Sequence, residues 1–373
     1  MRIHRMLPLP ICVAALGMLT AIGCGNGSSG NGSTGNPVAQ GGDGQRRIII
    51  LINGDSPFWD ACRVGVKEAD AKLDLGKSGL QAVLEVNDGT PEGQIDKLKQ
   101  FASQSDIAAL GISACDAGNE AVAEELRKLK AKGVHIVTID SDIDRSRMRD
   151  LRVAFIGTDN LGGGRELGKC ARNLRPDGGA YVTFVGRLGA QNAIDRIDGV
   201  RQGAGDKLKE LDKMGDDIDR ERARKNVRDA IANHPDLNTL VGIWSYNAPA
   251  IVDVVKEKDR RKDFTVVAFD AEPLAINSMS EGQIDAMVVQ NPFEMGYQGV
   301  RLMKALVQKD QATIKEILPN LGKPEGDIYD TGIKVVVPDT GSPLKPEMFD
   351  KKTKFLKLSD LKEWLAKYNL TGS

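Results

Sequence analysis

The chain has 373 residues, of which 51 are Lys or Arg and 52 are Asp or Glu, so its formal net charge is −1. A nucleic-acid-binding protein needs a clustered basic face, so this balance excludes that class and we expect no nucleic-acid partner. The length exceeds what one α/β core usually fills, which favours two lobes.

The N-terminal residues predict an exported protein. Arg2 and Arg5 precede a nearly wholly apolar stretch, residues 6–23, in the layout of a secretory signal. The sequence AIGC at 21–24 resembles a bacterial lipobox, in which the cysteine is acylated and becomes the new first residue. We therefore predict a lipoprotein signal at 1–23 and lipidation of Cys24. An ordinary cleaved signal without a lipid is the alternative.

The next segment, residues 24–45, is rich in Gly, Ser and Asn and has almost no apolar side chains. Such a segment cannot bury enough surface to offset its ordering entropy, so we predict a flexible tether with a reach of about 25 Å. No later stretch reaches the roughly 18 apolar residues of a spanning helix, so the only membrane contact expected is the lipid. The predicted location is the periplasm or the outer face of the cytoplasmic membrane.

From residue 46 onward, short aliphatic runs alternate with amphipathic stretches. The runs predict buried strands at 47–53, 82–86, 107–113, 134–139, 153–157, 181–186, 240–244, 265–270, 286–290 and 333–339. The other stretches predict helices at 57–73, 92–104, 117–132, 161–174, 192–209, 219–233, 247–258, 293–308 and 358–370. This alternation is typical of parallel sheets covered on both faces, so the predicted class is α/β with two doubly wound lobes.

Ligands of such sheets bind beyond the carboxyl ends of the strands, so we inspected the residues that follow each run. Aromatic, amide, carboxylate and guanidinium side chains gather there. The candidate ligand-binding residues are Ser56, Phe58, Trp59, Asp140, Asn192, Arg196, Tyr246, Asn247, Asp270 and Gln290. They come from both predicted lobes, so closely opposed lobes would bring them to one cleft.

This mixture of residue types suits a sugar. Each sugar hydroxyl both donates and accepts hydrogen bonds, so carboxylate, amide and guanidinium groups pair with neighbouring hydroxyls. The C–H face of a sugar ring is apolar and stacks on aromatic side chains. We therefore interpret Phe58 and Trp59 as one wall of a sugar-binding slot.

Each candidate also has a structural interpretation. Asp140 and Asp270 could cap the helices that follow them, and either ring of the pair at 58–59 could belong to a core. Arg196 could lie on a solvated, charged helix face. Asn247 could be a helix cap, and the Gln290 segment a turn. Their shared position at strand ends favours the site.

Seven segments resemble the ribose-type family of bacterial periplasmic sugar-binding proteins, in the right order over about residues 46–340. They are SPFWDACRVGVKEAD, VTIDSDID, FIGTDNLGGGRELG, AQNAIDRIDGVRQG, HPDLNTLVGIWSYNAPAI, VVAFDAEPLAINSM and VVQNPFEMGYQGV. The resemblance implies two lobes that close over a sugar around a three-strand hinge, with docking on an ABC importer. It also implies lobes that cut across the sequence: 46–156 with 291–320, and 157–290 with 321–340, followed by an extension at 341–373.

Two departures from the family pattern bear on the ligand. The ribose-like pattern often has Arg directly after the Asp140 position, where this chain has Ser141. It also has an aromatic residue in the loop after the Arg196 helix, where this chain has Ile218. The pocket is therefore expected to take another pentose, a hexose or a polyol rather than ribose.

The resulting hypothesis is a monomeric, non-enzymatic protein that captures a monosaccharide or polyol and delivers it to an ABC permease and ATPase, with no cofactor and no metal. A ligand sensor for a membrane kinase or chemoreceptor is the main alternative. A glycosidase using Asp140 and Asp270, and a sugar-responsive repressor, are weaker ones, since catalytic motifs and a DNA-binding module are not found in the sequence. The thiols Cys62, Cys115 and Cys170 lack CxxC spacing and are expected to be buried, with a disulfide left open.

Overall fold

The computed structural model describes residues 44–373, which belong to one compact unit. The predicted signal, the lipidation site Cys24 and nearly all of the tether lie outside the described residues. Within the described part of the chain, no helix is both long and apolar enough to cross a membrane.

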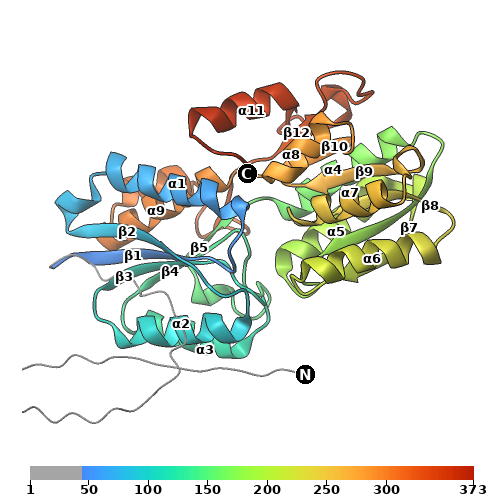
Figure 1. Ribbon diagram of the computed structural model, residues 1–373. Helices are drawn as coiled ribbons and strands as arrows, with labels where there is room; N and C mark the ends of the chain where they lie inside the picture. The colour runs from blue at the N-terminus through green and yellow to red at the C-terminus, as the bar shows by residue number, and fades with distance from the viewer. Residues whose placement is uncertain (1–43) are drawn as a thin grey trace, which may run out of the picture. The chain divides into compact units, whose positions relative to one another are not determined.

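The first lobe is built on a six-stranded sheet in which every pairing is parallel. Across the sheet its strands are β11 (Ile328–Asp330), β5 (Ala154–Gly157), β4 (His135–Ile139), β3 (Ile107–Ile112), β1 (Arg46–Leu51) and β2 (Leu80–Glu85). Figure 1 shows helices on both faces: α1 (Pro57–Lys72) and α9 (Pro292–Gln308) on one, α2 (Pro91–Ser103) and α3 (Glu120–Ala131) on the other. The short α10 (Gln311–Ile317) packs against α9.

The second lobe is built on a seven-stranded sheet that is parallel except where β12 pairs with β10. Across the sheet its strands are β13 (Lys354–Lys357), β12 (Lys334–Val337), β10 (Ala286–Val289), β9 (Thr265–Phe269), β8 (Leu237–Gly242), β6 (Gly179–Val185) and β7 (Leu208–Gly215). Its helices are α4 (Asn160–Leu174), α5 (Gln191–Ala204), α6 (Arg220–Asn233), α7 (Asn247–Glu257), α8 (Pro273–Ser280) and α11 (Leu358–Lys367). The two sheets confirm the predicted α/β class.

The chain passes between the two sheets three times, at 158–159, 290–291 and 331–333. The first and third crossovers are bonded to each other. The backbone N–H of Asp159 donates to Asp330 Oδ1 over 3.2 Å, and the N–H of Thr331 donates to the Gly157 carbonyl over 2.7 Å. Lys352 adds an ion pair to Asp159 over 2.8 Å.

The central strands follow the aliphatic runs, whereas the elements that the sequence did not reveal are mostly at the edges. Strand β7 reads LKELDKMG and pairs only with β6, so one side of it stays solvated and carries charge. The predicted helix 192–209 therefore ends early, at Ala204, and the chain turns at Gly205, where φ is +57°. The short β11 and β13 and the helices α8 and α10 were also not predicted.

The C-terminal segment changes the predicted lobe boundaries. Strand β11 pairs with β5, so residues 328–330 belong to the first sheet, although 321–340 was expected in the second lobe. The predicted extension at 341–373 is part of the second lobe, because β13 pairs with β12 and Leu361 of α11 is fully buried in that lobe's core. Its last residue, Ser373, exchanges two backbone hydrogen bonds with Ala271, of 2.7 and 2.9 Å.

The three described cysteines are free and buried, which answers the question of a disulfide for Cys62, Cys115 and Cys170. Burial raises the pKa of the Cys115 thiol to about 11 and raises those of the other two as well. Thiolates are the reactive form of cysteine, so these side chains act as small apolar groups in the native protein.

Candidate ligand-binding site

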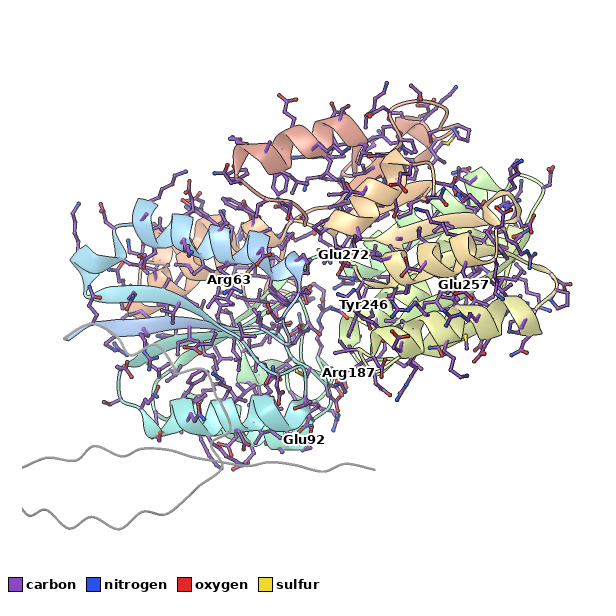
Figure 2. All side chains as sticks on the ribbon, viewed as in Figure 1. Arg63, Glu92, Arg187, Tyr246, Glu257 and Glu272 are labelled. Carbon is purple, nitrogen blue, oxygen red and sulfur yellow. The ribbon has the colours of Figure 1, made fainter. Side chains whose placement is uncertain are left out.

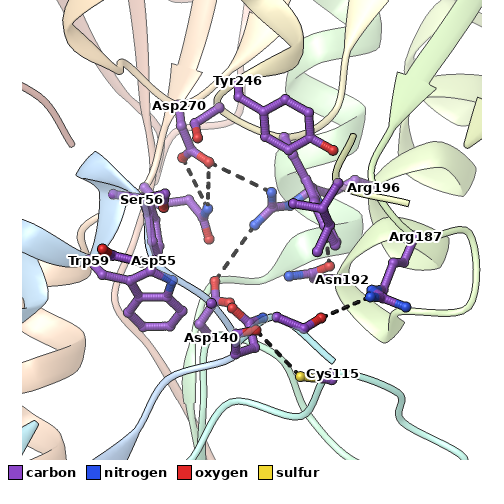
Figure 3. A pocket seen from close by; sticks show the side chains of 18 of the residues that line it. Asp55, Ser56, Trp59, Cys115, Asp140, Arg187, Asn192, Arg196, Tyr246 and Asp270 are labelled. Atoms are coloured by element: carbon purple, nitrogen blue, oxygen red, sulfur yellow. Dashed lines mark hydrogen bonds and ion pairs between the residues drawn. The ribbon is translucent and has the colours of Figure 1, made fainter. Parts of the chain in front are cut away.

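A cavity of about 320 Å³ lies where the carboxyl ends of the two sheets face each other (Figure 3). Small-molecule sites generally span about 300–1,000 Å³, so this one is at the small end of the range. Its lining residues are Asn53, Gly54, Asp55, Ser56, Phe58, Trp59, Gly89, Cys115, Asp140, Arg187, Asn192, Arg196, Ile218, Arg220, Trp244, Ser245, Tyr246, Asp270 and Gln290.

Nearly all the residues proposed from the sequence meet at this cavity. Those that line it are Ser56, Phe58, Trp59, Asp140, Asn192, Arg196, Tyr246, Asp270 and Gln290. The exception is Asn247, which is fully buried behind the wall. Its Nδ2 donates to Asp216 over 2.9 Å, and its Oδ1 accepts the backbone N–H of Trp244 over 3.0 Å. Asn247 is therefore removed from the candidate contacts. It does not cap α7 either, because Tyr246 holds the N-cap position and no side chain caps this helix.

The two carboxylates are presented by an unusual backbone conformation. Asp140 follows β4 with φ of +62°, and Asp270 follows β9 with φ of +65°. The backbone N–H of each donates to the adjoining strand, to Ile156 O over 3.0 Å and to Val288 O over 2.8 Å. A positive φ is uncommon for residues other than glycine and gathers at functional sites. Neither aspartate caps a helix, since α8 begins after Glu272.

A buried guanidinium joins the two carboxylates. Nη2 of Arg196 lies 4.0 Å from Asp140 Oδ1, and Nη1 lies 3.8 Å from Asp270 Oδ2 (Figure 3). The side chain is only 1% exposed, which rules out the interpretation as a solvated helix charge. It is fixed by hydrogen bonds to Asn160 Oδ1 (2.9 Å) and Ile243 O (3.1 Å) and by the ring of Phe269, 4.1 Å away.

Burial dominates the ionisation of this cluster. It raises the pKa of Asp140 to about 6, with Arg196 opposing the rise and Asp270 adding to it. It also raises the pKa of Asp270 and lowers that of Arg196. Ser113 donates to Asp140 Oδ2 over 3.2 Å, and the ion pair of Asp140 Oδ1 with Arg196 is longer than a hydrogen bond, so Oδ1 can accept from a ligand.

Three buried polar atoms of lining residues have no hydrogen-bond partner within the described residues 44–373. One is Nε of Arg187, and the other two belong to the polar cluster: Nη2 of Arg196, a donor, and Oε1 of Gln290, an acceptor. The Nε2 of Gln290 donates to both oxygens of Asp270, over 3.0 and 3.2 Å, which fixes the direction of the amide. An unsatisfied buried group costs about 1–3 kcal/mol. Ligand hydroxyls, which donate and accept, would satisfy both atoms.

Aromatic rings flank this polar cluster. Phe58 and Trp59, in the first turn of α1, are in edge-to-face contact with ring centroids 5.0 Å apart. Both rings also pack into the first lobe's core while lining the cavity, so the core interpretation holds and does not conflict with a place in the site. The second lobe supplies Trp244, whose Nε1 donates to Asn192 Oδ1 over 3.2 Å.

Several lining residues were not among the predicted contacts. Gly89 and Cys115 follow β2 and β3, so applying the strand-end rule to these strands would have found them. Arg187 donates to the carbonyl of Gly89 over 2.8 Å and so links the two lobes. Figure 2 shows it with Tyr246 along the side of the second lobe that faces the first. Trp244 lies within one of the seven segments that resemble the family but was not singled out, and no motif marked Arg187 or Arg220.

Comparisons with known proteins agree with this architecture. The ribose import binding protein of Bacillus subtilis is 23% identical over 245 residues, covering 65% of this chain and 75% of the relative. The D-allose-binding periplasmic protein of Escherichia coli is 23% identical over 262 residues, covering 68% and 82%. An ABC transporter solute-binding protein from Burkholderia graminis, solved with D-arabinose, has a TM-score of 0.69 at 24% identity, covering 80% of this chain and 97% of that one.

A family model described as a periplasmic binding protein domain matches residues 48–311, well over half of the chain. The similar proteins are binding proteins of sugar transport systems, which confirms the prediction of a non-enzymatic protein over the glycosidase alternative. The chain therefore belongs to the periplasmic binding protein domain family, and within it is similar to ribose-type sugar-binding proteins, as its motifs predicted.

Proposed function

We propose that this protein captures a monosaccharide, or a closely related polyol, and delivers it to an ABC importer. The observation that carries the proposal is the pair of unpartnered buried atoms, Arg196 Nη2 and Gln290 Oε1, in a cavity that also holds two carboxylates. Aromatic rings from opposite lobes border the same cavity. Hydroxyls on an otherwise apolar ring match this combination.

The size of the cavity and the relatives support a monosaccharide. The volume of about 320 Å³ has little room for a second sugar ring. The names and titles of similar proteins specify ribose, D-allose and D-arabinose, which are all single sugars. Ser141 and Ile218 replace larger groups of the ribose-like pattern, so we propose a sugar other than ribose.

We propose that binding proceeds by hinge closure. Trp59 and Asp140 belong to the first lobe, whereas Arg196 and Asp270 belong to the second. A sugar can contact both pairs only when the lobes are together, so it shifts the population toward the closed form. The three crossovers at 158–159, 290–291 and 331–333 are the segments about which the lobes would rotate.

The functional prediction is a selective thermal shift. A ligand that binds only the folded state at 100 times its Kd stabilises it by about 2.7 kcal/mol, which raises the Tm by several degrees. We expect one or a few sugars in a panel of pentoses, hexoses, polyols and disaccharides to do so. Calorimetry then gives the Kd. A panel in which amino acids or peptides raise the Tm and no sugar does would contradict the proposal.

We also propose that the chain is anchored through Cys24 in the periplasm or at the outer face of the cytoplasmic membrane. Replacing Cys24 with alanine is expected to abolish incorporation of labelled palmitate and to release the protein from the membrane fraction, because one thioether linkage would carry the anchor. The change Ser28→Ala, in the tether, is the matched control. Labelled palmitate retained in the Cys24→Ala protein would contradict the anchor.

A further inference from the structure

A buried carboxylate that does not line the cavity lies directly behind its second-lobe wall. Asp216 follows β7 and is fully buried. Its Oδ1 accepts from the Tyr246 hydroxyl and from the backbone N–H of Ile218, the latter over 2.9 Å. Its Oδ2 accepts from Asn247 Nδ2 over 2.9 Å. No cation pairs with this carboxylate within residues 44–373. The three hydrogen bonds from these donors are therefore what offsets the cost of burying it.

The same network continues to the cavity wall. Asn247, oriented by Asp216, accepts the backbone N–H of Trp244 over 3.0 Å. The indole of Trp244 then donates to Asn192 over 3.2 Å. Trp244, Tyr246 and Asn192 all line the cavity. With Ile218, which also lines the cavity and donates to Asp216 directly, the carboxylate reaches four lining residues through hydrogen bonds, while remaining outside the cavity.

The backbone of Gly186 limits the movement of the Trp244 and Tyr246 rings away from the cavity. A Cβ on Gly186 would lie 2.2 Å from the Trp244 ring and 2.8 Å from the Tyr246 hydroxyl, so both side chains rest against the bare backbone of Gly186. Asp216 is anchored at the same place, because its backbone N–H donates to Gly186 O over 3.2 Å. The position of the rings therefore depends on the Gly186 backbone and on the Asp216 network.

We propose that Asp216 is a positioning residue that sets the place of Trp244 and Tyr246 and thereby selects among sugars at the second-lobe wall. The proposal rests on the proposed sugar-binding function. Burying a carboxylate without a cation is costly, and buried polar groups of this kind are kept in some proteins because they impose a unique arrangement. Here Asp216 would impose one arrangement of the Trp244 and Tyr246 rings, which border the ligand.

The hydrogen-bond geometry predicts that Asp216→Asn disrupts this network. An amide at this position keeps one acceptor oxygen and replaces the other with an NH₂ group. If the oxygen faces Tyr246, the NH₂ group faces the NH₂ group of Asn247. If Asn247 reverses its amide, it then presents a donor to the N–H of Trp244. If the oxygen faces Asn247 instead, the NH₂ group faces the backbone N–H of Ile218, and the Tyr246 hydroxyl must turn from donor to acceptor. In each arrangement one donor loses its acceptor, so the network that holds the rings must rearrange.

The test compares Asp216→Asn with Asp217→Asn in the full chain. Asp217 is exposed and pairs with Arg222 on the surface, so it is a neighbouring control with the same chemical change. We expect Asp216→Asn to weaken binding of the preferred sugar at least tenfold, to alter the ratio of affinities between epimeric sugars, and to change the near-ultraviolet circular dichroism of the ligand-free protein. Asp217→Asn should change none of these.

A merely structural role for Asp216 predicts a different result: a lower Tm with unchanged affinity ratios and an unchanged aromatic spectrum, and this outcome overturns the proposal. Should Asp216→Asn fail to fold, Tyr246→Phe is the second variant, because it removes one hydrogen bond of the network without burying a new donor. Unchanged affinity ratios between epimeric sugars in Tyr246→Phe would also overturn the proposal. The spectrum of the ligand-free protein separates this proposal from the sugar-binding function, since it is measured without any sugar.

Discussion

Replacing Arg196 with alanine is expected to weaken sugar binding strongly and to lower the stability of the fold. The change removes the unpartnered Nη2 donor and leaves Asp140 and Asp270 buried without a cation. Removing one partner of a buried ion pair generally costs about 3–5 kcal/mol of stability. The loss of binding should exceed about 2 kcal/mol, which corresponds to roughly a 30-fold higher Kd. Titration calorimetry and thermal unfolding measure the two effects separately.

Two further variants make the Arg196 result interpretable. Arg201→Ala changes the same residue type on the same helix, but this arginine is half exposed and pairs with Asp198 and Glu210 on the surface. It should leave both affinity and Tm nearly unchanged. Arg196→Lys keeps the charge but not the planar fork, so it should recover stability more than affinity. A folded Arg196→Ala protein that binds sugar with wild-type affinity would remove this residue from the site.

The core of each sheet was predictable because a central strand in a parallel sheet is buried on both faces. Such a strand reads as a continuous aliphatic run, as in RIIIL at the start of the first sheet. Edge strands are not buried in this way. Strand β7 has four charged residues among its eight, so nothing in its composition distinguishes it from the end of a helix. The lobe to which β11 belongs depends on pairing between distant segments, which periodicity does not encode.

The site was predictable to the extent that chain position determines it. The carboxyl end of every strand points to the same edge, so residues there share a neighbourhood before any contact is known. The rule does not tell which of two adjacent residues turns outward: Tyr246 lines the cavity, while Asn247 turns back to Asp216. It also says nothing of contacts that arise only when lobes meet, such as Arg187 with Gly89.

The stability of the ligand-free protein should depend on pH through the ionisation of Asp140. Burial raises its pKa from the ordinary value of 3.8 to about 6, so between these pH values the native state holds a proton that the unfolded chain has lost. Stability of the ligand-free protein should therefore be greatest below pH 4 for this group and fall as the pH rises to about 6, by roughly 3 kcal/mol at most. Asp216, whose pKa burial also raises to about 6, adds a slope of the same sign.

Sugar binding should show the opposite dependence, because hydroxyl donors favour the ionised carboxylate of Asp140. As the pH falls below about 6, protonation competes with the ligand, and affinity should decline by up to about tenfold per pH unit. Calorimetry at pH 5 in buffers of different ionisation enthalpy should detect a released proton on binding. Asp140→Asn should bind the sugar more weakly, with an affinity that no longer depends on pH in this range. Asp144→Asn, a surface change in the same loop, should retain the pH dependence of the affinity. An affinity that is level from pH 5 to pH 7 in the unmodified protein would show that Asp140 does not accept from the ligand, since a carboxylate with this pKa cannot bind hydroxyl donors equally well in both of its protonation states.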